Sequence, residues 1–447
     1  MQSKYVRKIA ALAAVFAFKS SLASAQIPAN ASLSIVTAVS SNSITINDPS
    51  NRVWIMMTST NLAAWNEQGA WKVFNGTFHQ SFTNGSGSIF YRATYDPAQQ
   101  TVLDTALLLP SALFDYIPVL PQDFLVPPIS VQDNTPATNA ITDAGAQLGR
   151  VLFYDKRLST NQTISCSSCH QAAHGFADPR TVSVGFDGSL GTRNAMGLNN
   201  ARYYQRGHFF WDERAATLED QVLQPIQNPI EMGMTLPTLV SRLAGEPFYT
   251  NLFTQVFGTP AVTTNRISVA LAQFVRSIVT TNSRYDQGVS IGFTNLTTQE
   301  NLGRQIFFGQ VGKATCSLCH TTDIEVAANI FNNGLEFPYV DKGVGGITAR
   351  AQDMGLFKVP SLRNIELTAP YMHDGRFTNL DQVVEFYNSE IVSNANLSPP
   401  LRGPGGTPLR LNLTTAQKSA LVAFLKTLTD TTATMDARFS DPFNYGN

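Results

Sequence analysis

Two five-residue motifs hold all four cysteines of the chain. Residues 166–170 read Cys-Ser-Ser-Cys-His, and residues 316–320 read Cys-Ser-Leu-Cys-His. C-x-x-C-H is the attachment pattern of haem c, in which both thiols add to the vinyl groups of the porphyrin and the histidine becomes the proximal ligand of the iron. The sequence therefore predicts two covalently bound haem c groups, one on Cys166, Cys169 and His170 and the other on Cys316, Cys319 and His320.

The first 25 residues have the three parts of a secretory signal peptide. Lys4, Arg7 and Lys8 form a basic start, residues 9–18 are apolar, and residues 23–25 (Ala-Ser-Ala) offer a cleavage site. The apolar run is too short to cross ~30 Å of hydrocarbon as a helix, and no later run approaches ~20 apolar residues. We therefore expect cleavage after about Ala25, a periplasmic or secreted location, and no membrane span.

C-x-x-C pairs also occur in thioredoxin-like redox sites and, together with histidine, in zinc sites. Two copies that each carry their own histidine, in a chain with an export signal, disfavour both alternatives. Charged residues make up only 14% of the chain and the formal net charge is -1. There is no basic stripe, so we expect no nucleic-acid partner.

Residues 26–98 differ from the rest of the chain. The short stretches 33–36, 43–46 and 53–57 are rich in residues that favour strands and are separated by turn residues. We expect a small all-β, sandwich-like module here. Residues 99–137 contain six prolines, which predicts an extended linker.

From residue 138 onwards the chain repeats itself. An apolar stretch with helical spacing precedes each haem motif, and an Arg-Asn pair and a further matched stretch follow it. The matched segments are residues 148–154 and 302–308, 193–194 and 363–364, and 211–214 and 373–376. The repeat predicts a mainly α fold with two cytochrome c-like haem domains, residues 138–294 and 295–447.

Aligning the two halves compares their expected axial ligands. When Trp211 is set against His373, Pro225 falls opposite Tyr387. Tyrosine can bind haem iron, whereas proline has no donor in its side chain. We therefore expect a closed second haem with His320 and Tyr387 as ligands, and an open first haem on His170. A tyrosine in such a place can also be a plain buried aromatic.

Residues 138 to about 435 resemble the bacterial di-haem cytochrome c peroxidase family, and within it the MauG-type branch. Besides the two haem motifs, three segments carry the resemblance. They are residues 211–221 (WDERAATLEDQ), 228–234 (NPIEMGM) and 360–375 (PSLRNIELTAPYMHDG). The resemblance covers about two thirds of the chain and leaves the β-module unexplained.

The resemblance implies roles for three residues of the first half. Glu231 matches the family's distal carboxylate, which takes a proton from one peroxide oxygen and returns it to the other. Gln221 matches a polar residue that holds peroxide or water, and Trp211 matches the tryptophan between the haems, a candidate electron relay. Without the motifs, Glu231 reads as a solvated loop acid and Trp211 as a core residue.

The resemblance also implies one calcium ion between the domains. Asn194, Thr368 and Pro370 match its protein ligands, one side-chain oxygen and two backbone carbonyls. Oxygen donors of this kind suit a hard cation. His373 lies in a family motif near the haem interface, and its role is open.

The sequence departs from the family's peroxidases at two positions. A histidine commonly blocks the peroxidatic iron in those enzymes, whereas Phe186 stands at the matching place here. They also usually carry a methionine where this chain has Tyr387. His174 is an alternative ligand for the first iron, and Met354 and Met372 are alternatives for the second.

These features predict a periplasmic peroxidase. Hydrogen peroxide is expected to react at the haem on His170, and electrons from a small redox protein are expected to arrive through the second haem. An anionic tyrosinate ligand lowers the potential of the second haem, which equally suits a MauG-like oxidase that modifies aromatic residues of a partner protein. A non-enzymatic electron-transfer cytochrome is a third alternative, which an open first haem disfavours.

Overall fold

A computed structural model describes residues 32–37, 41–47, 53–60, 63–64, 66–72, 77–83, 90–95, 107–314, 316–321 and 329–443. The expected signal peptide and its cleavage site after about Ala25 lie outside these residues. No helix within the described ranges is both long enough and apolar enough to cross a membrane.

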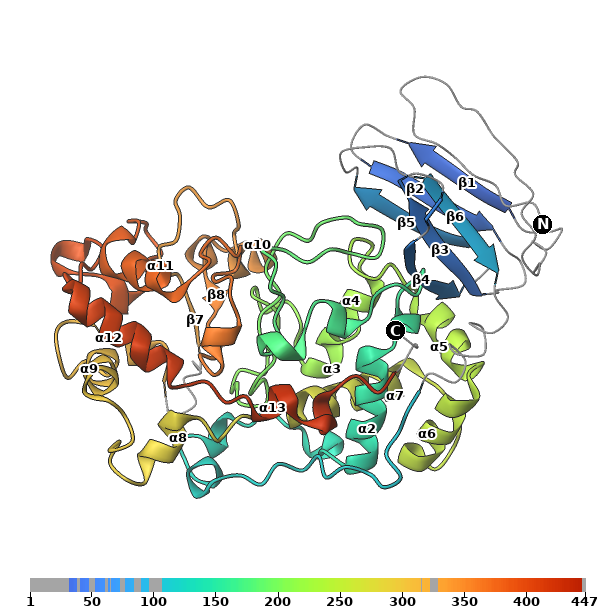
Figure 1. Ribbon diagram of the computed structural model, residues 1–447. Coiled ribbons are helices and arrows are strands. Elements are labelled where there is room, and N and C mark those ends of the chain that lie inside the picture. The colour runs from blue at the N-terminus through green and yellow to red at the C-terminus, as the bar shows by residue number, and fades with distance from the viewer. Residues whose placement is uncertain are drawn as a thin grey trace.

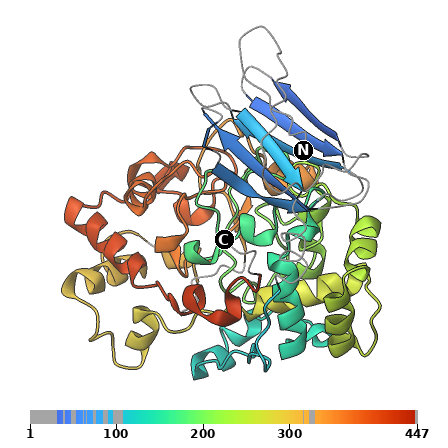
Figure 2. The same ribbon diagram turned by 45° about the vertical axis from the view of Figure 1, so that its right-hand side comes forward.

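Six strands form two three-stranded antiparallel sheets at one side of the molecule (Figures 1 and 2). One sheet has the order β1 (Ser32–Thr37), β2 (Ser41–Asn47) and β5 (Thr77–Thr83). The other has the order β4 (Asn66–Lys72), β3 (Val53–Ser59) and β6 (Phe90–Tyr95). Buried side chains come from both sheets, Ile46 from the first and Trp54, Phe90 and Ala93 from the second.

Each half of the remaining chain is organised around a pair of crossing helices. In the first half, α2 (Asp143–Tyr154) packs on α7 (Thr264–Ser277). In the second, α9 (Thr298–Phe307) packs on α12 (Thr415–Lys426). The prediction of a mainly helical chain is confirmed.

Two glycines at matching places permit these crossings. A Cβ added to Gly149 would overlap the carbonyl oxygen of Ala270, and one added to Gly303 would overlap the carbonyl oxygen of Ala420. The helix backbones therefore touch at the crossing point, and only glycine leaves room for that. Gly149 and Gly303 occupy the same place in the repeated segments 148–154 and 302–308. The sequence repeat therefore reflects the same helix packing in both halves.

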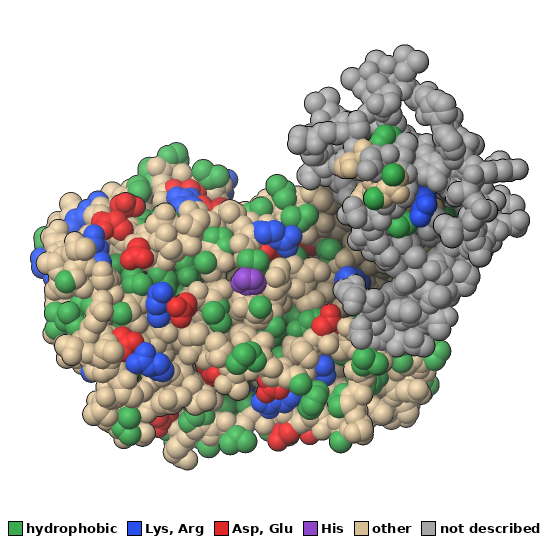
Figure 3. All heavy atoms as spheres, viewed as in Figure 1, with side chains coloured by type: hydrophobic (Ala, Val, Ile, Leu, Met, Phe, Trp, Pro, Cys, Tyr) green, Lys and Arg blue, Asp and Glu red, His purple; other side chains and the backbone are tan. Residues whose placement is uncertain are grey.

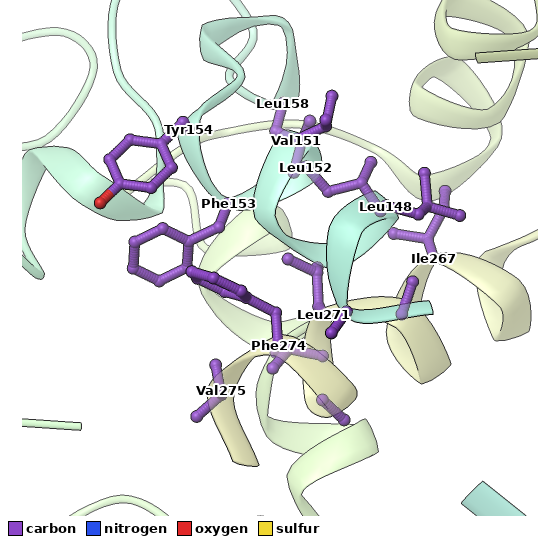
Figure 4. Close-up of a cluster of buried hydrophobic side chains, with 14 of the residues drawn as sticks. Leu148, Val151, Leu152, Phe153, Tyr154, Leu158, Ile267, Leu271, Phe274 and Val275 are labelled. Atoms are coloured by element: carbon purple, nitrogen blue, oxygen red, sulfur yellow. The ribbon is translucent and has the colours of Figure 1, made fainter. Parts of the chain in front are cut away.

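The hydrophobic core of the first half gathers around this helix crossing, as Figure 4 shows for Leu148, Leu152, Phe153, Leu271 and Phe274. A second core lies between α9 and α12. Shorter elements complete the two halves. They are α3 (Leu218–Gln221), α4 (Gln224–Gln227), α5 (Leu236–Ala244), α6 (Pro247–Phe257), α8 (Arg284–Val289), β7 (Ile330–Phe331), α10 (Val344–Thr348), β8 (Phe357–Lys358), α11 (Leu380–Glu385) and α13 (Thr432–Met435).

The backbone repeats itself at the spacing that the sequence suggested. An antiparallel bridge joins Phe209 to Ala215 in the first half, and the same bridge joins Tyr371 to Phe377 in the second. The helices that follow, α3 and α11, begin at the aligned residues Leu218 and Leu380. The alignment that sets Pro225 against Tyr387 therefore has a structural basis.

Two segments differ from the predicted domain boundaries. The predicted extended linker covers residues 99–137, of which 99–106 lie outside the described residues. Residues 107–137 pack on the first half: Tyr116 is buried and its hydroxyl lies 3.0 Å from Oε1 of Gln147. The prolines interrupt regular secondary structure here, but apolar residues between them still pack into the hydrophobic core. The chain also returns after α12, because Ala433, Phe439 and Phe443 join the core of the first half.

Candidate haem sites

The first haem motif forms a tight 3₁₀ turn (Cys166–Ser168) that orients its histidine. Ser165 and Ser168 cap the turn reciprocally, and the amide of His170 donates to the carbonyl of Cys166 at 2.9 Å. Nδ1 of His170 lies 2.9 Å from the carbonyl oxygen of Phe176. That hydrogen bond fixes Nδ1 as the protonated nitrogen and leaves Nε2 as the atom that can bind a metal. Burial lowers the pKa of His170, which favours the neutral ring that ligation needs.

The second motif repeats this turn (Cys316–Leu318), and the amide of His320 again donates to Cys316 at 2.9 Å. Its cysteines and histidine line a mostly apolar cavity of about 230 Å³. Leu380, Val384, Leu421 and Leu425, from α11 and α12, also line it. An apolar cavity beside a C-x-x-C-H turn fits a porphyrin, with His320 and the two thiols at one wall.

Burial raises the pKa of the thiols in both motifs, to about 12 for Cys166 and Cys316 and to about 11 for Cys319. Reactive thiol–disulfide sites need the opposite shift, because the thiolate is the nucleophile. The four cysteines are not joined in disulfides. Both facts favour haem attachment over a redox-active pair.

Tyr387 lies in the cavity of the second half, on a π-helical turn (Phe386–Glu390) that directly follows α11. Its hydroxyl is 3.4 Å from Nδ2 of Asn333, which also lies 3.6 Å from the sulfur of Met372. Burial raises the pKa of Tyr387 to about 12, and Asn333 opposes that rise. Met372 lines the same cavity, whereas Met354 is not among its lining residues.

The matching region of the first half has a proline at the place of Tyr387 and carries a carboxylate in the loop that follows. Pro225 is the second residue of α4, and the loop after α4 brings in Glu231. Nδ2 of Asn228 donates to Oε1 of Glu231 at 2.8 Å. Burial raises the pKa of Glu231, while Arg214 and Asn228 lower it. Its charge raises the pKa of the thiols of Cys166 and Cys169, which places Glu231 near the first haem motif.

Phe186 supports the loop that holds Glu231. Its amide donates to the carbonyl of Glu231 at 2.8 Å, and a Cβ added to Gly233 would lie 2.5 Å from its ring. Phe186 is therefore a packing residue beside the carboxylate and offers no ligand to iron. Gln221 ends α3, one turn before Pro225, and is partly buried.

Trp211 connects the two halves. Its indole nitrogen donates to the carbonyl of Asn194 at 2.8 Å, and its ring lies edge-on to His373 at 6.4 Å between centroids. Although it belongs to the first half, Trp211 lines the cavity of the second. His373 stacks on Phe357 at 4.0 Å, and burial lowers its pKa.

The predicted calcium ligands also meet at this cavity. Asn194, Thr368 and Pro370 all line it, and Nδ2 of Asn194 donates to the carbonyl of Arg180 at 3.0 Å, which leaves Oδ1 as the atom for a cation. Oδ1 of Asn199, a further lining residue, is buried without a hydrogen-bond partner in the described part of the chain. These oxygen donors fit calcium or its bound water.

Sequence reasoning missed several residues of this region. Asn333 has no local signal at all, since only the tertiary fold brings its loop beside Tyr387. Lys358 is buried and lines the cavity, and its amide donates to the carbonyl of Trp211 at 2.8 Å. Its place two residues before the segment 360–375 was a signal, although an isolated lysine is usually exposed.

Residues 143–291 match the model of the di-haem cytochrome c peroxidase family. The chain is 36% identical to the cytochrome c551 peroxidase of Nitrosomonas europaea, over 64% of this chain and 79% of the relative. It is also 36% identical to the methylamine utilization protein MauG of Paracoccus denitrificans, over 64% of this chain and 89% of the relative. Among solved structures, a MauG-like protein associated with microbial copper homeostasis is similar at a TM-score of 0.63 and 35% identity, covering 72% of this chain and 98% of that protein.

Proposed function

This chain belongs to the di-haem cytochrome c peroxidase family, and we propose from that premise that His170 would hold the haem at which hydrogen peroxide reacts and that His320 would hold the haem through which electrons arrive. Family membership makes the protein a haem-dependent oxidoreductase that acts on peroxide. The observation that carries the division of labour is the contrast between Pro225 and Tyr387 at matching places. Haem c supplies the iron chemistry, and the protein residues bind, orient and move protons.

Glu231 is the proposed proton shuttle. As a carboxylate it would accept a proton from one oxygen of hydrogen peroxide and return it to the other oxygen, which would leave as water. Partial burial, a raised pKa and the hydrogen bond from Asn228 all suit a group that must take up and release a proton. Gln221 would hold peroxide or water beside it.

The second haem is proposed to be closed by His320 and Tyr387, with Met372 as the alternative to Tyr387. Trp211 would relay electrons, because it belongs to the first half and touches the cavity of the second. Domain assignments follow: residues 138–294 are the peroxidatic domain, and the electron-transfer domain begins at 295. Residues 26–98 form the proposed sandwich-like module.

The proposal also includes one calcium ion between the domains, which Asn194, Thr368 and Pro370 would hold.

We further propose that the N-terminal segment directs the protein to the periplasm. Basic and acidic side chains are interspersed on the described part of the face in Figure 3, so neither sign of charge dominates that face.

A second function follows from Tyr387, because a tyrosine that binds iron through its oxygen would do so as an anionic ligand. Such a ligand favours oxidised iron, so the protein would store oxidising equivalents and use them on aromatic residues of a partner protein. Relatives named MauG support this alternative. The peroxidase and the oxidase differ in their source of electrons. A small redox protein would supply them to the peroxidase, and the substrate protein itself would supply them to the oxidase. A non-enzymatic cytochrome does not agree with relatives that are enzymes.

The test is to add hydrogen peroxide to the pure diferric protein and record its absorption spectrum by stopped flow. We expect the haem bands to change without prior reduction, since Phe186 offers no ligand that must first leave the iron. If the haem bands change only after one-electron reduction, the prediction that the first haem has an open axial position is wrong.

A further inference from the structure

Beside Trp211 lies a buried polar cluster that the proposed mechanism does not use. The hydroxyl of Tyr204 donates to Oε1 of Glu213, and Arg206 binds both carboxylate oxygens, Oε1 from Nε at 2.8 Å and Oε2 from Nη2 at 2.6 Å. Tyr204 and Glu213 are both buried, with 1% and 8% of their surface exposed. We propose that Tyr204 is a redox-active residue that gives up one electron toward Trp211 and the haems, and its phenolic proton to Glu213.

One lysine joins this cluster to the relay tryptophan. The amide of Lys358 donates to the carbonyl of Trp211, and its ammonium nitrogen lies 4.2 Å from the centre of the Tyr204 ring. Lys358 therefore contacts both the ring of Tyr204 and the backbone of Trp211, and it lines the haem cavity.

The same lysine dictates the form of the oxidised tyrosine. A positive charge against the ring opposes formation of a second positive charge on it. Tyr204 can therefore lose an electron only if its proton leaves at the same time, and the hydrogen-bonded carboxylate of Glu213 is in place to take it. Burial and Glu213 raise the pKa of Tyr204, so the resting residue is a neutral phenol that holds the proton to be moved.

The internal repeat gives independent evidence that Glu213 is held in place for a purpose. Glu213 has φ 53°, a left-handed conformation that is costly for a residue with a side chain. The matching residue of the second half is Gly375, with φ 66°. Glycine adopts this conformation at little cost. A glutamate at such a position needs a compensating contact, and the contacts it makes are Tyr204 and Arg206.

The proposed step is balanced. One electron would leave Tyr204 by way of Trp211 for the haems, which the reaction with peroxide would supply as the one-electron oxidant, and one proton would pass from the Tyr204 hydroxyl to Glu213. Tyr204 would then be a neutral radical and Glu213 a protonated carboxylic acid, and the oxidant would have gained one electron. Arg206, with 36% of its side chain exposed, lets water screen the charge that Glu213 no longer balances. The step rests on the proposed peroxide reaction, which supplies the oxidant.

Electron paramagnetic resonance of the freeze-quenched holoprotein tests the inference. After peroxide is added to the diferric protein, we expect an organic radical whose spectrum narrows when the protein contains ring-deuterated tyrosine. The signal should be lost in Tyr204→Phe and in Glu213→Gln. Tyr203→Phe is the matched control: Tyr203 is adjacent and as deeply buried, but its hydroxyl has no hydrogen-bond partner in the described part of the chain, so the signal should remain.

If Tyr204→Phe fails to fold because Glu213 is left without its donor, the double variant Tyr204→Phe/Glu213→Gly removes the carboxylate and restores the residue type of Gly375. A radical that persists in either variant, or that does not narrow with deuterated tyrosine, would overturn the inference. Haem bands that change without any tyrosyl radical would overturn it as well.

Haem bands that never respond to peroxide would instead overturn the proposed function. In that case flash oxidation with ruthenium tris-bipyridine and a cobalt(III) quencher tests Tyr204 separately. A tyrosyl radical that disappears in Tyr204→Phe supports the inference, and one that is unchanged overturns it.

Discussion

The two halves share a scaffold and differ at the positions where we propose the distal side of each haem to lie. Both have a helix crossing on glycine, a C-x-x-C-H turn, and a bridge that leads into a short helix at Leu218 or Leu380. Seven residues into that alignment, one half has Pro225 and the other Tyr387. The first half places Glu231 in its next loop, whereas the second has a π-helical turn. The packing is therefore the same in both halves, and the side chains that we propose to act on the haems differ.

Removing the carboxylate of Glu231 should have the largest effect on this contrast. We expect Glu231→Gln to slow peroxide cleavage by roughly 10²–10⁴-fold, because the amide cannot accept the proton. Stopped-flow spectra measure the rate. Glu390→Gln, an exposed acid of the second half, is the control and should leave the rate unchanged. An unaltered rate in Glu231→Gln with normal haem content would make Glu231 an ordinary loop acid.

Making the second half resemble the first is the next test. Tyr387→Phe should open the second haem, so that its low-spin signal in electron paramagnetic resonance is replaced by a high-spin signal while the first haem is unchanged. Met372→Leu, in the same cavity, should leave both signals alone. If Met372→Leu abolishes the low-spin signal and Tyr387→Phe does not, the ligand is Met372 and the contrast between the halves is the one found in methionine-ligated peroxidases.

The two glycine crossings should prove equivalent. Gly149→Ala and Gly303→Ala each force a methyl group into a backbone carbonyl, and overpacking of this kind costs about 1–3 kcal/mol of unfolding free energy. Denaturant unfolding measures the loss. Gly346→Ala is the control, since its nearest neighbour would be Cβ of Lys342 at an ordinary 3.6 Å. A loss in one half alone would show that the shared scaffold is tighter on that side.

The sequence could predict those features of the two halves that depend on residues close together in the chain, but not those that depend on contacts between distant residues. The cysteine motifs, and the offset that pairs Pro225 with Tyr387, are written in short segments. The burial of Tyr116 was hidden, because prolines around it suggest a linker and its partner Gln147 is distant in sequence. The return of Phe439 to the first core is equally non-local. Glu213 could have been noticed as the glutamate that stands opposite Gly375.

Removal of the segment before the first half should have a smaller effect, on stability alone. A protein that begins at residue 107 should keep both haems and its peroxide reaction, because the haem motifs lie later in the chain. One that begins at residue 130 loses Tyr116, Phe124 and Ile129, which are all buried. Burial of such side chains contributes about 1.5–3 kcal/mol each, so the shorter protein should melt at a lower temperature. Equal melting temperatures of the two proteins would show that residues 107–129 add no stability and act only as a linker.

The smallest expected effect concerns the asparagine that accompanies the acidic group in each half, Asn228 beside Glu231 and Asn333 beside Tyr387. Asn228 lowers the pKa of Glu231, which burial has raised. The shuttle must begin as a carboxylate, so the peroxide rate should fall as the pH drops through this raised pKa. Asn228→Ala removes a donor that favours the charged form, hence the pKa rises further and the rate is lost at a higher pH. A pH profile of the stopped-flow rate measures the displacement. Asn333→Ala touches only the second half and should leave that profile in place. A displacement of the profile toward lower pH in Asn228→Ala, or an equal displacement in both variants, would show that the acid that limits the rate is not Glu231.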